Sequence, residues 1–199
     1  MTSASMASRQ LILASTSPFR KTLLTQLQLT FEIFAPRVDE TPKPHETPFS
    51  LVMRLAQLKA QAAQAFYPQA LVIAADQIAV LKEHILGKPG HHEQAVQQLL
   101  AMQGQQVDFL TGLCLLNTQT QQWQCDVVRF SVQFRSLTLS QIEHYLQQEQ
   151  PYNCSGSFKS EGLGIVLVEA MLGQDPSALI GLPLLRLIRM LEVEGVQLI

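Results

Sequence analysis

The sequence has few charged side chains and no excess of either sign. Lys and Arg together number 14 and Asp and Glu number 16, which gives a formal net charge of -2 over 199 residues. A protein that coats nucleic acid without regard to sequence needs a basic excess to neutralise phosphates. The near balance argues against that class of protein, and we expect no nucleic-acid partner.

Long apolar runs are also missing. No run approaches the roughly 18–20 apolar residues that a membrane-spanning helix needs. The start of the chain is polar, and the apolar stretch that follows at residues 11–14 is too short for the core of a signal peptide. We therefore expect no membrane association, a loose extension over residues 1–8 and a single domain over residues 9–199.

Cysteine is scarce as well. The three cysteines are too few and too scattered for a disulfide framework, and they lack the spacing of zinc ligands. Cys114 lies in an apolar, strand-like run, where a thiol behaves as a small buried hydrophobe. This pattern favours a reduced, cytoplasmic protein.

What the sequence does have is apolar material in a regular order. Hydrophobic residues make up 47% of the chain, enough for one sizeable core or two small lobes. Short apolar runs alternate with helical periods, which predicts an α/β fold. We expect helices over residues 18–27, 48–66, 92–102, 140–148 and 183–194. We expect strands over residues 11–14, 31–35, 70–81, 106–117 and 124–134, the last two forming a hairpin.

Residues 15–21, Ser-Thr-Ser-Pro-Phe-Arg-Lys, join the first predicted strand to the first predicted helix. Ser17 suits the N-cap and Pro18 the first helical position. Free backbone N–H groups and the helix dipole favour an anion at such a junction. The pattern indicates a phosphate site, although many similar junctions bind nothing. Its candidate residues are Ser15, Ser17, Arg20 and Lys21.

Three further charged residues interrupt apolar or constrained segments. Asp76 lies inside the apolar run of residues 71–80, where a carboxylate is costly unless it is paired or metal-bound. It is therefore a candidate base or metal ligand facing a cleft, or else a strand-end residue that caps a loop. Lys88 sits in a tight Gly-Lys-Pro turn that constrains its backbone. Lys59 lies on a predicted helix and would, by itself, be interpreted as a solvated lysine.

Two loops complete the pattern. The charged, proline-rich segment at residues 37–46 includes Asp39 and Glu40 and belongs to the class of surface loops that often carries function. The glycine- and serine-rich segment at residues 154–164 includes Lys159 and Glu161. Such a loop can bring backbone N–H groups against a ligand.

These motifs, in this order, resemble those of the Maf-like nucleotide pyrophosphatase family, and the resemblance spans residues 11 to about 191. The family pattern has Ser-x-Ser-x-Arg-Arg after the first strand, then Asp-Glu, Leu-Ala-x-x-Lys-Ala, an Asp-bearing strand, a Gly-Lys-Pro turn and a glycine-containing loop. Lys21 replaces the second arginine, which keeps the charge but loses the bidentate fork. The resemblance implies a mixed twisted sheet with flanking helices and two lobes around a central cleft.

The resemblance also implies a reaction. Family members hydrolyse a nucleoside triphosphate between the α and β phosphates, giving a monophosphate and pyrophosphate. Glu40 and Asp76 would hold a divalent cation, Mg²⁺ or Mn²⁺, and Asp76 would accept the proton. An unperturbed aspartate, with a pKa of about 3.9, is a poor base at neutral pH. We therefore expect Asp76 to act through a water whose pKa the metal lowers toward about 7. The expected phosphate ligands are Ser15, Ser17, Arg20, Lys21, Lys59 and Lys88.

Within the family, the sequence is most similar to the branch that acts on 7-methyl-GTP, which implies that Phe19, Gln77 and Glu161 determine specificity. The ring of Phe19 could stack on the positively charged base, a contact worth about 0.5–2 kcal/mol. Glu161 could accept hydrogen bonds from the guanine N1–H and 2-amino groups. Without the resemblance, Phe19 would be interpreted as a core residue of the first turn and Glu161 as a solvated loop charge.

Two other functions are compatible with these residues. One keeps the family but changes the nucleotide to dTTP, UTP or another non-standard nucleotide, and Glu161 argues against it. The other is a nucleotide-binding regulator of cell division without turnover, which the retention of Glu40, Asp76 and the basic groups disfavours. A homodimer is also possible, because the apolar stripe of residues 184–191 could be buried within the chain or at a contact between copies.

Overall fold

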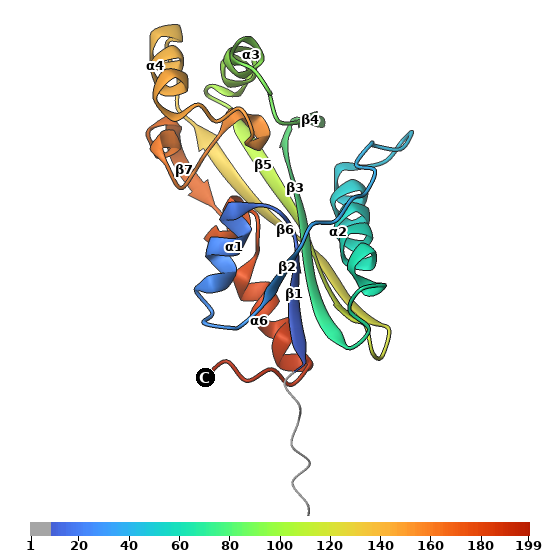
Figure 1. The fold of residues 1–199 in the computed structure, drawn as a ribbon. Helices are drawn as coiled ribbons and strands as arrows, with labels where there is room; N and C mark the ends of the chain where they lie inside the picture. Colours follow the sequence, from blue (N-terminus) through green and yellow to red (C-terminus); the bar gives the residue numbers. More distant parts are fainter. Residues whose placement is uncertain (1–8) are drawn as a thin grey trace, which may run out of the picture.

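The structure is a computed structural model that describes residues 9–199. The extension predicted for residues 1–8 lies outside the described residues. The fold is built on a seven-stranded sheet with the order β2-β1-β3-β5-β6-β7, and β4 pairs with β3 (Figure 1). The strands are β1 Gln10–Ala14, β2 Glu32–Phe34, β3 Ala70–Leu81, β4 His84–Leu86, β5 Gln106–Asn117, β6 Gln122–Phe134 and β7 Val168–Leu172.

The sheet is mixed. β1 runs parallel to both β2 and β3, whereas β3 to β7 are joined by antiparallel pairings. β5 and β6 pair along their whole length from Gln106 opposite Gln133 to Asn117 opposite Gln122, so the predicted hairpin is confirmed. The α/β class and the mixed sheet flanked by helices are confirmed as well. The helices are α1 Pro18–Thr25, α2 Pro48–Gln64, α3 His92–Met102, α4 Leu139–Glu149, α5 Pro176–Ile180 and α6 Leu184–Val193.

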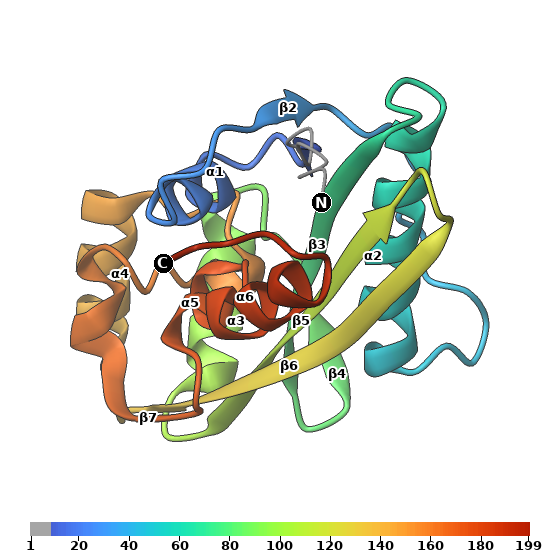
Figure 2. The same cartoon turned by 90° about the horizontal axis from the view of Figure 1, so that it is seen from below.

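Helices cover both faces of the sheet because buried strand residues alternate in direction. In β1, Leu11 and Leu13 pack with α1 and α6, whereas Ile12 and Ala14 pack with α2 on the opposite face. Figure 2 shows α2 on one side of β3, β5 and β6 and α6 on the other. The alanines of α2 (Ala56, Ala60 and Ala63) let this helix lie close to the sheet.

A separate core cluster lies at the other end of the long strands. There α3 and α4 pack on the last part of β3, the start of β5 and the end of β6. Its largest fully buried side chains include Phe109, Phe134 and Tyr145. β3, β5 and β6, with 12, 12 and 13 residues, therefore extend from one core cluster to the other.

The sequence did not predict β4, β7 or α5. β4 has three residues and α5 has five, too few for a periodic pattern. β7 is largely exposed along its length and shows no alternation of apolar and polar residues. Among residues 9–199, no helix combines the length and apolar character that crossing a bilayer requires.

The expectation that the cysteines are separate and reduced is wrong for two of them. Cys114 is buried, as predicted, but it forms a disulfide with Cys125. The two residues face each other across β5 and β6, with Cα atoms 4.2 Å apart. This pairing depends on the register of the hairpin, which cysteine counting does not reveal.

Candidate active site

A cleft of about 910 Å³ lies over the middle of β3, and several separate segments of the chain contribute to it. This volume is in the range of small-molecule sites. The cleft is lined by the β1–α1 junction, the loop before α2, one face of α2, the middle of β3, the turn after β4 and the segment after α4. Every predicted site residue except Lys21 lines it: Ser15, Ser17, Phe19, Arg20, Glu40, Lys59, Asp76, Gln77, Lys88 and Glu161.

At the floor of the cleft, Lys59 joins the two carboxylates that were predicted to bind metal. Its Nζ lies 2.6 Å from Asp76 Oδ1 and 2.6 Å from Glu40 Oε1. Lys59 and Asp76 are buried, whereas the Glu40 side chain is 57% exposed. A carboxylate inside an apolar strand is thus balanced by a buried ammonium, which accounts for Asp76 within β3.

A glycine that sequence reasoning missed makes this contact possible. Gly112 of β5 lies directly opposite Asp76 of β3. A Cβ added at Gly112 would lie 2.2 Å from the carbonyl oxygen of Val52. Only glycine allows α2 to approach the sheet this closely, and the same approach brings Lys59 of α2 to Asp76.

The charges of the cleft perturb one another. Burial raises the pKa of Glu40, but the hydrogen bond and the charge of Lys59, with Lys88 and Arg20, more than offset it. The pKa of Glu40 therefore lies below its ordinary value of 4.5. Burial lowers the pKa of Arg20, and the negative charges of Asp76 and Glu40 act against that shift. These mutual effects arise because the groups lie close together in one cleft.

The junction between β1 and α1 has the predicted form. Ser17 caps α1 by accepting a hydrogen bond from the backbone N–H of Arg20 at 3.4 Å. Ser15 Oγ accepts from Ser17 N at 3.2 Å and from Arg20 Nη1 at 3.3 Å. Arg20 Nε also donates to the carbonyl of Gly181 at 2.8 Å. The arginine is thus fixed at the helix N-terminus, whereas Lys21 is exposed and does not line the cleft.

Asp76 and Gln77 point to opposite faces of β3, as alternation along a strand requires. Asp76 faces α2, whereas Gln77 Nε2 contacts α5 through the carbonyls of Ala178 at 2.7 Å and Leu179 at 2.9 Å. Gln77 Nε2 also lies 3.1 Å from Thr111 Oγ1. Both side chains line the cleft, so the two faces of β3 each contribute one polar side chain to it.

The donor set fits a magnesium or manganese ion with few protein ligands. Within the described part of the chain, no group of three or more His, Cys, Asp or Glu side chains could hold a metal. Mg²⁺ is commonly bound by one or two carboxylates, with water and substrate phosphates completing its coordination. Glu40 and Asp76, which contact the same Nζ, provide such a pair.

The segment after α4 forms the opposite wall. It includes two 3-10 turns, Ser155–Ser157 and Leu163–Leu167. Phe158 is buried against Phe109 and Phe134, which anchors the segment in the core. Glu161 is exposed at the cleft, where Ser160 Oγ donates to its Oε2 at 3.2 Å. Phe19 also lines the cleft and is half-buried, so its ring is not a core residue.

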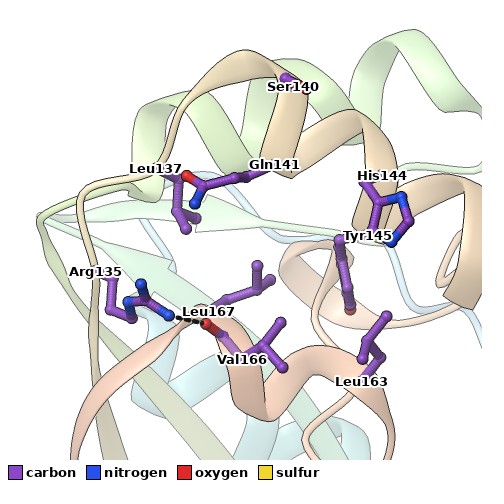
Figure 3. Close-up of a pocket in the computed structure, with 9 residues that line it drawn as sticks. All are labelled: Arg135, Leu137, Ser140, Gln141, His144, Tyr145, Leu163, Val166 and Leu167. Atoms are coloured by element: carbon purple, nitrogen blue, oxygen red, sulfur yellow. Dashed lines mark hydrogen bonds between the residues drawn. The ribbon is translucent and has the colours of Figure 1, made fainter.

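A second cavity, of about 520 Å³, lies outside the cleft (Figure 3). It is formed by the start of α4 and the second 3-10 turn, and Arg135 at its edge donates to the carbonyl of Val166 at 2.8 Å. None of the predicted site residues lines it. All of them except Lys21 line the cleft instead.

Comparison with known proteins identifies the family of this chain. The sequence model of a family described as "Maf-like protein" matches residues 10–194. The 7-methyl-GTP pyrophosphatase of Nitrosococcus oceani is 57% identical over 185 residues, which cover 93% of each chain. That of Methylobacillus flagellatus is 53% identical over 189 residues, 95% of this chain and 98% of its own. That of Vibrio cholerae is 51% identical over 194 residues, 98% of this chain and all of its own.

Proposed function

The chain belongs to the Maf-like protein family, and from this premise we propose that it is a nucleoside triphosphate pyrophosphatase that hydrolyses 7-methyl-GTP to 7-methyl-GMP and pyrophosphate. Relatives with 50–57% identity over nearly the whole chain carry the name 7-methyl-GTP pyrophosphatase. The observation that carries the proposal is the contact of Lys59 with both Asp76 and Glu40 at the floor of a nucleotide-sized cleft.

The proposed reaction needs charge neutralisation and alignment more than covalent chemistry. Arg20 and the N-terminus of α1 would bind the phosphate chain, and Lys88 would add positive charge from the turn after β4. Glu40 and Asp76 would hold Mg²⁺ or Mn²⁺, which when bound offsets phosphate charge and acidifies water. Because Asp76 Oδ1 already accepts from Lys59, Oδ2 is the atom left to accept a proton from the attacking water.

Base selection would fall to the residues at the two walls. A positively charged 7-methylguanine ring is attracted to the face of an aromatic side chain, here Phe19. Glu161 would accept hydrogen bonds from N1–H and the 2-amino group, donors that a pyrimidine lacks. Gln77 ties β3 to α5 and so holds the floor between these walls.

The proposal also covers the partner, the location in the cell and the oligomeric state. We expect a free nucleotide as the partner and the cytoplasm as the location. A homodimer stays a prediction, although Leu184, Leu187 and Leu191 of the apolar stripe are buried within the chain itself.

The test is a substrate comparison with Mg²⁺ or Mn²⁺ present, in which pyrophosphate release is measured for 7-methyl-GTP, UTP and dTTP. The proposal expects kcat/KM for 7-methyl-GTP to exceed the other two values by at least about tenfold, since missing hydrogen bonds to a buried or charged partner discriminate strongly. A preference for a pyrimidine nucleotide would contradict the substrate but keep the reaction. Tight nucleotide binding without pyrophosphate release would instead indicate a regulator.

A further inference from the structure

The segment that carries Glu161 is fastened to the last residue of α4. Glu149 Oε2 accepts a hydrogen bond from the backbone N–H of Leu163 at 2.6 Å, and its Oε1 pairs with Lys159 Nζ. These contacts lie two residues before and two residues after Glu161. From this geometry we infer that Glu149 is a positioning residue for base recognition, acting through the segment of residues 159–164. The inference rests on the proposed function.

The backbone of this segment lies directly against the Glu149 carboxylate. A Cβ added at Gly162 would lie 2.4 Å from Glu149 Oε2, closer than real side chains approach. The φ of Gly162 is -122°, a value that any residue can adopt, so the glycine is needed for the close approach rather than for its backbone angle. The backbone N–H groups of Gly162 and Gly164 both donate to the carbonyl of Lys159 at 3.2 Å, which closes the turn.

A second anchor on the same face of α4 fixes the start of the segment. Tyr145, one turn before Glu149, donates from its hydroxyl to the carbonyl of Ser157 at 3.2 Å. The same hydroxyl accepts from the backbone N–H of Lys159 at 3.1 Å. Tyr145 is almost fully buried, so this anchor is part of the packed core. The hydrogen bonds of Tyr145 reach only as far as Lys159. Glu149 holds the part of the segment that follows through Leu163.

Glu149 is also the carboxylate that pairs with the Lys159 ammonium. The hydrogen bond from Lys159 comes first among the causes that lower the pKa of Glu149, so this carboxylate is ionised at neutral pH. Within residues 9–199, the Glu161 carboxylate forms no ion pair. If Glu149 were neutral, the Lys159 ammonium would have Glu161, two residues along the chain, as an alternative partner. An ion pair there would compete with the base for Glu161.

The experiment measures steady-state kinetics of the Glu149→Gln variant on 7-methyl-GTP and on UTP. We expect KM for 7-methyl-GTP to rise about tenfold while kcat stays within about twofold, because loss of a hydrogen bond to a charged group weakens binding of the base without touching the reacting phosphates. The preference for 7-methyl-GTP over UTP should fall by a similar factor. Glu143→Gln is the matched control, since this carboxylate of α4 pairs with His92 at 2.7 Å and lies outside the cleft.

A second pair of variants tests the contact itself. Gly162→Ala should raise KM as Glu149→Gln does, because the new methyl group displaces the carboxylate. The double variant Glu149→Ala, Gly162→Ala should be no worse than Glu149→Ala alone, since the clash has been removed. Non-additivity of this kind measures direct coupling between neighbours. If Glu149→Gln does not fold, the single variant Gly162→Ala, which keeps the carboxylate, decides the question through its preference for 7-methyl-GTP over UTP.

An unchanged preference in a folded Glu149→Gln variant would overturn the inference, and so would equal losses on both nucleotides or additive effects of Glu149→Ala and Gly162→Ala. The wild-type protein separates this failure from failure of the proposed function. If wild type does not hydrolyse 7-methyl-GTP, both fall. If wild type is active and only the variants behave otherwise than expected, the proposed function stands and Glu149 has no positioning role.

Discussion

At the scale of single residues, the sequence identified charged side chains whose burial is unfavourable without a partner. Asp76 was singled out because a carboxylate within an apolar strand needs a partner, and the structure supplies Lys59. Residues whose role depends on a distant partner were missed. Arg54 is one of these, because it binds Glu46 and the Thr41 carbonyl. No local pattern in the sequence reports such a contact.

The Asp76→Asn variant tests the proton acceptor. The amide cannot accept a proton at neutral pH, so we expect kcat to fall by about 10²–10⁴-fold, the usual contribution of a general base. The fold should persist, because Lys59 keeps Glu40 as a partner. Circular dichroism and thermal unfolding serve as controls for the fold. Near-normal turnover in the folded variant would show that Asp76 is not the base.

At the scale of elements, helices and long strands followed from periodicity and capping, whereas short pieces did not. The predicted cap at Ser17 is present, and the hairpin of β5 and β6 has the expected extent. Periodicity could not predict how closely a helix approaches the sheet. Gly112 sets the distance between α2 and the sheet, and its significance appears only once Val52 is seen above it.

Gly112→Ala tests that approach. The added methyl group would meet the Val52 carbonyl at 2.2 Å, so α2 must move away from the sheet. We expect a loss of about 1–3 kcal/mol in the free energy of unfolding, the usual cost of overpacking. Turnover should fall with it, because Lys59 moves away from Asp76. Denaturant unfolding and steady-state kinetics provide the two measurements, and a variant with wild-type stability and rate would refute the argument.

The loop between β2 and α2 is tied to α2 by Arg54 and Glu46, and this tie predicts a pH dependence. Arg54 Nε lies 2.6 Å from Glu46 Oε1, and this hydrogen bond is the main cause that lowers the pKa of Glu46 from 4.5 to about 2. A carboxyl whose folded pKa is depressed stabilises the protein fully above its unfolded pKa and loses that contribution as the pH falls toward the folded pKa. The tie also holds the loop that carries Glu40.

We therefore expect the Glu46 carboxyl resonance to titrate near pH 2 in wild type. In Arg54→Leu it should titrate at about pH 4.3, the value of an unperturbed glutamate. The difference in free energy of unfolding between wild type and Glu46→Gln should be constant from neutral pH down to about 5 and should shrink below that. An ordinary titration midpoint in wild type would show that the ion pair does not persist in solution.

At the scale of the whole molecule, the order of motifs predicted one cleft, and the structure assembles it from segments far apart in the chain. Arg20 and Gly181 are 161 positions apart and in contact. The family resemblance was necessary here, because composition and periodicity indicate an α/β fold but not which charged residues meet. The disulfide between Cys114 and Cys125 shows the same limit, since only the hairpin register brings the two residues together.

The bond that is cleaved tests the central claim most directly. Wild-type protein is incubated with 7-methyl-GTP and Mg²⁺, and the products are separated by anion-exchange chromatography. The arrangement of Arg20, Lys59, Asp76 and Glu40 around one phosphate-binding cleft predicts equimolar 7-methyl-GMP and pyrophosphate. Release of orthophosphate with 7-methyl-GDP, or no product at all, would contradict it.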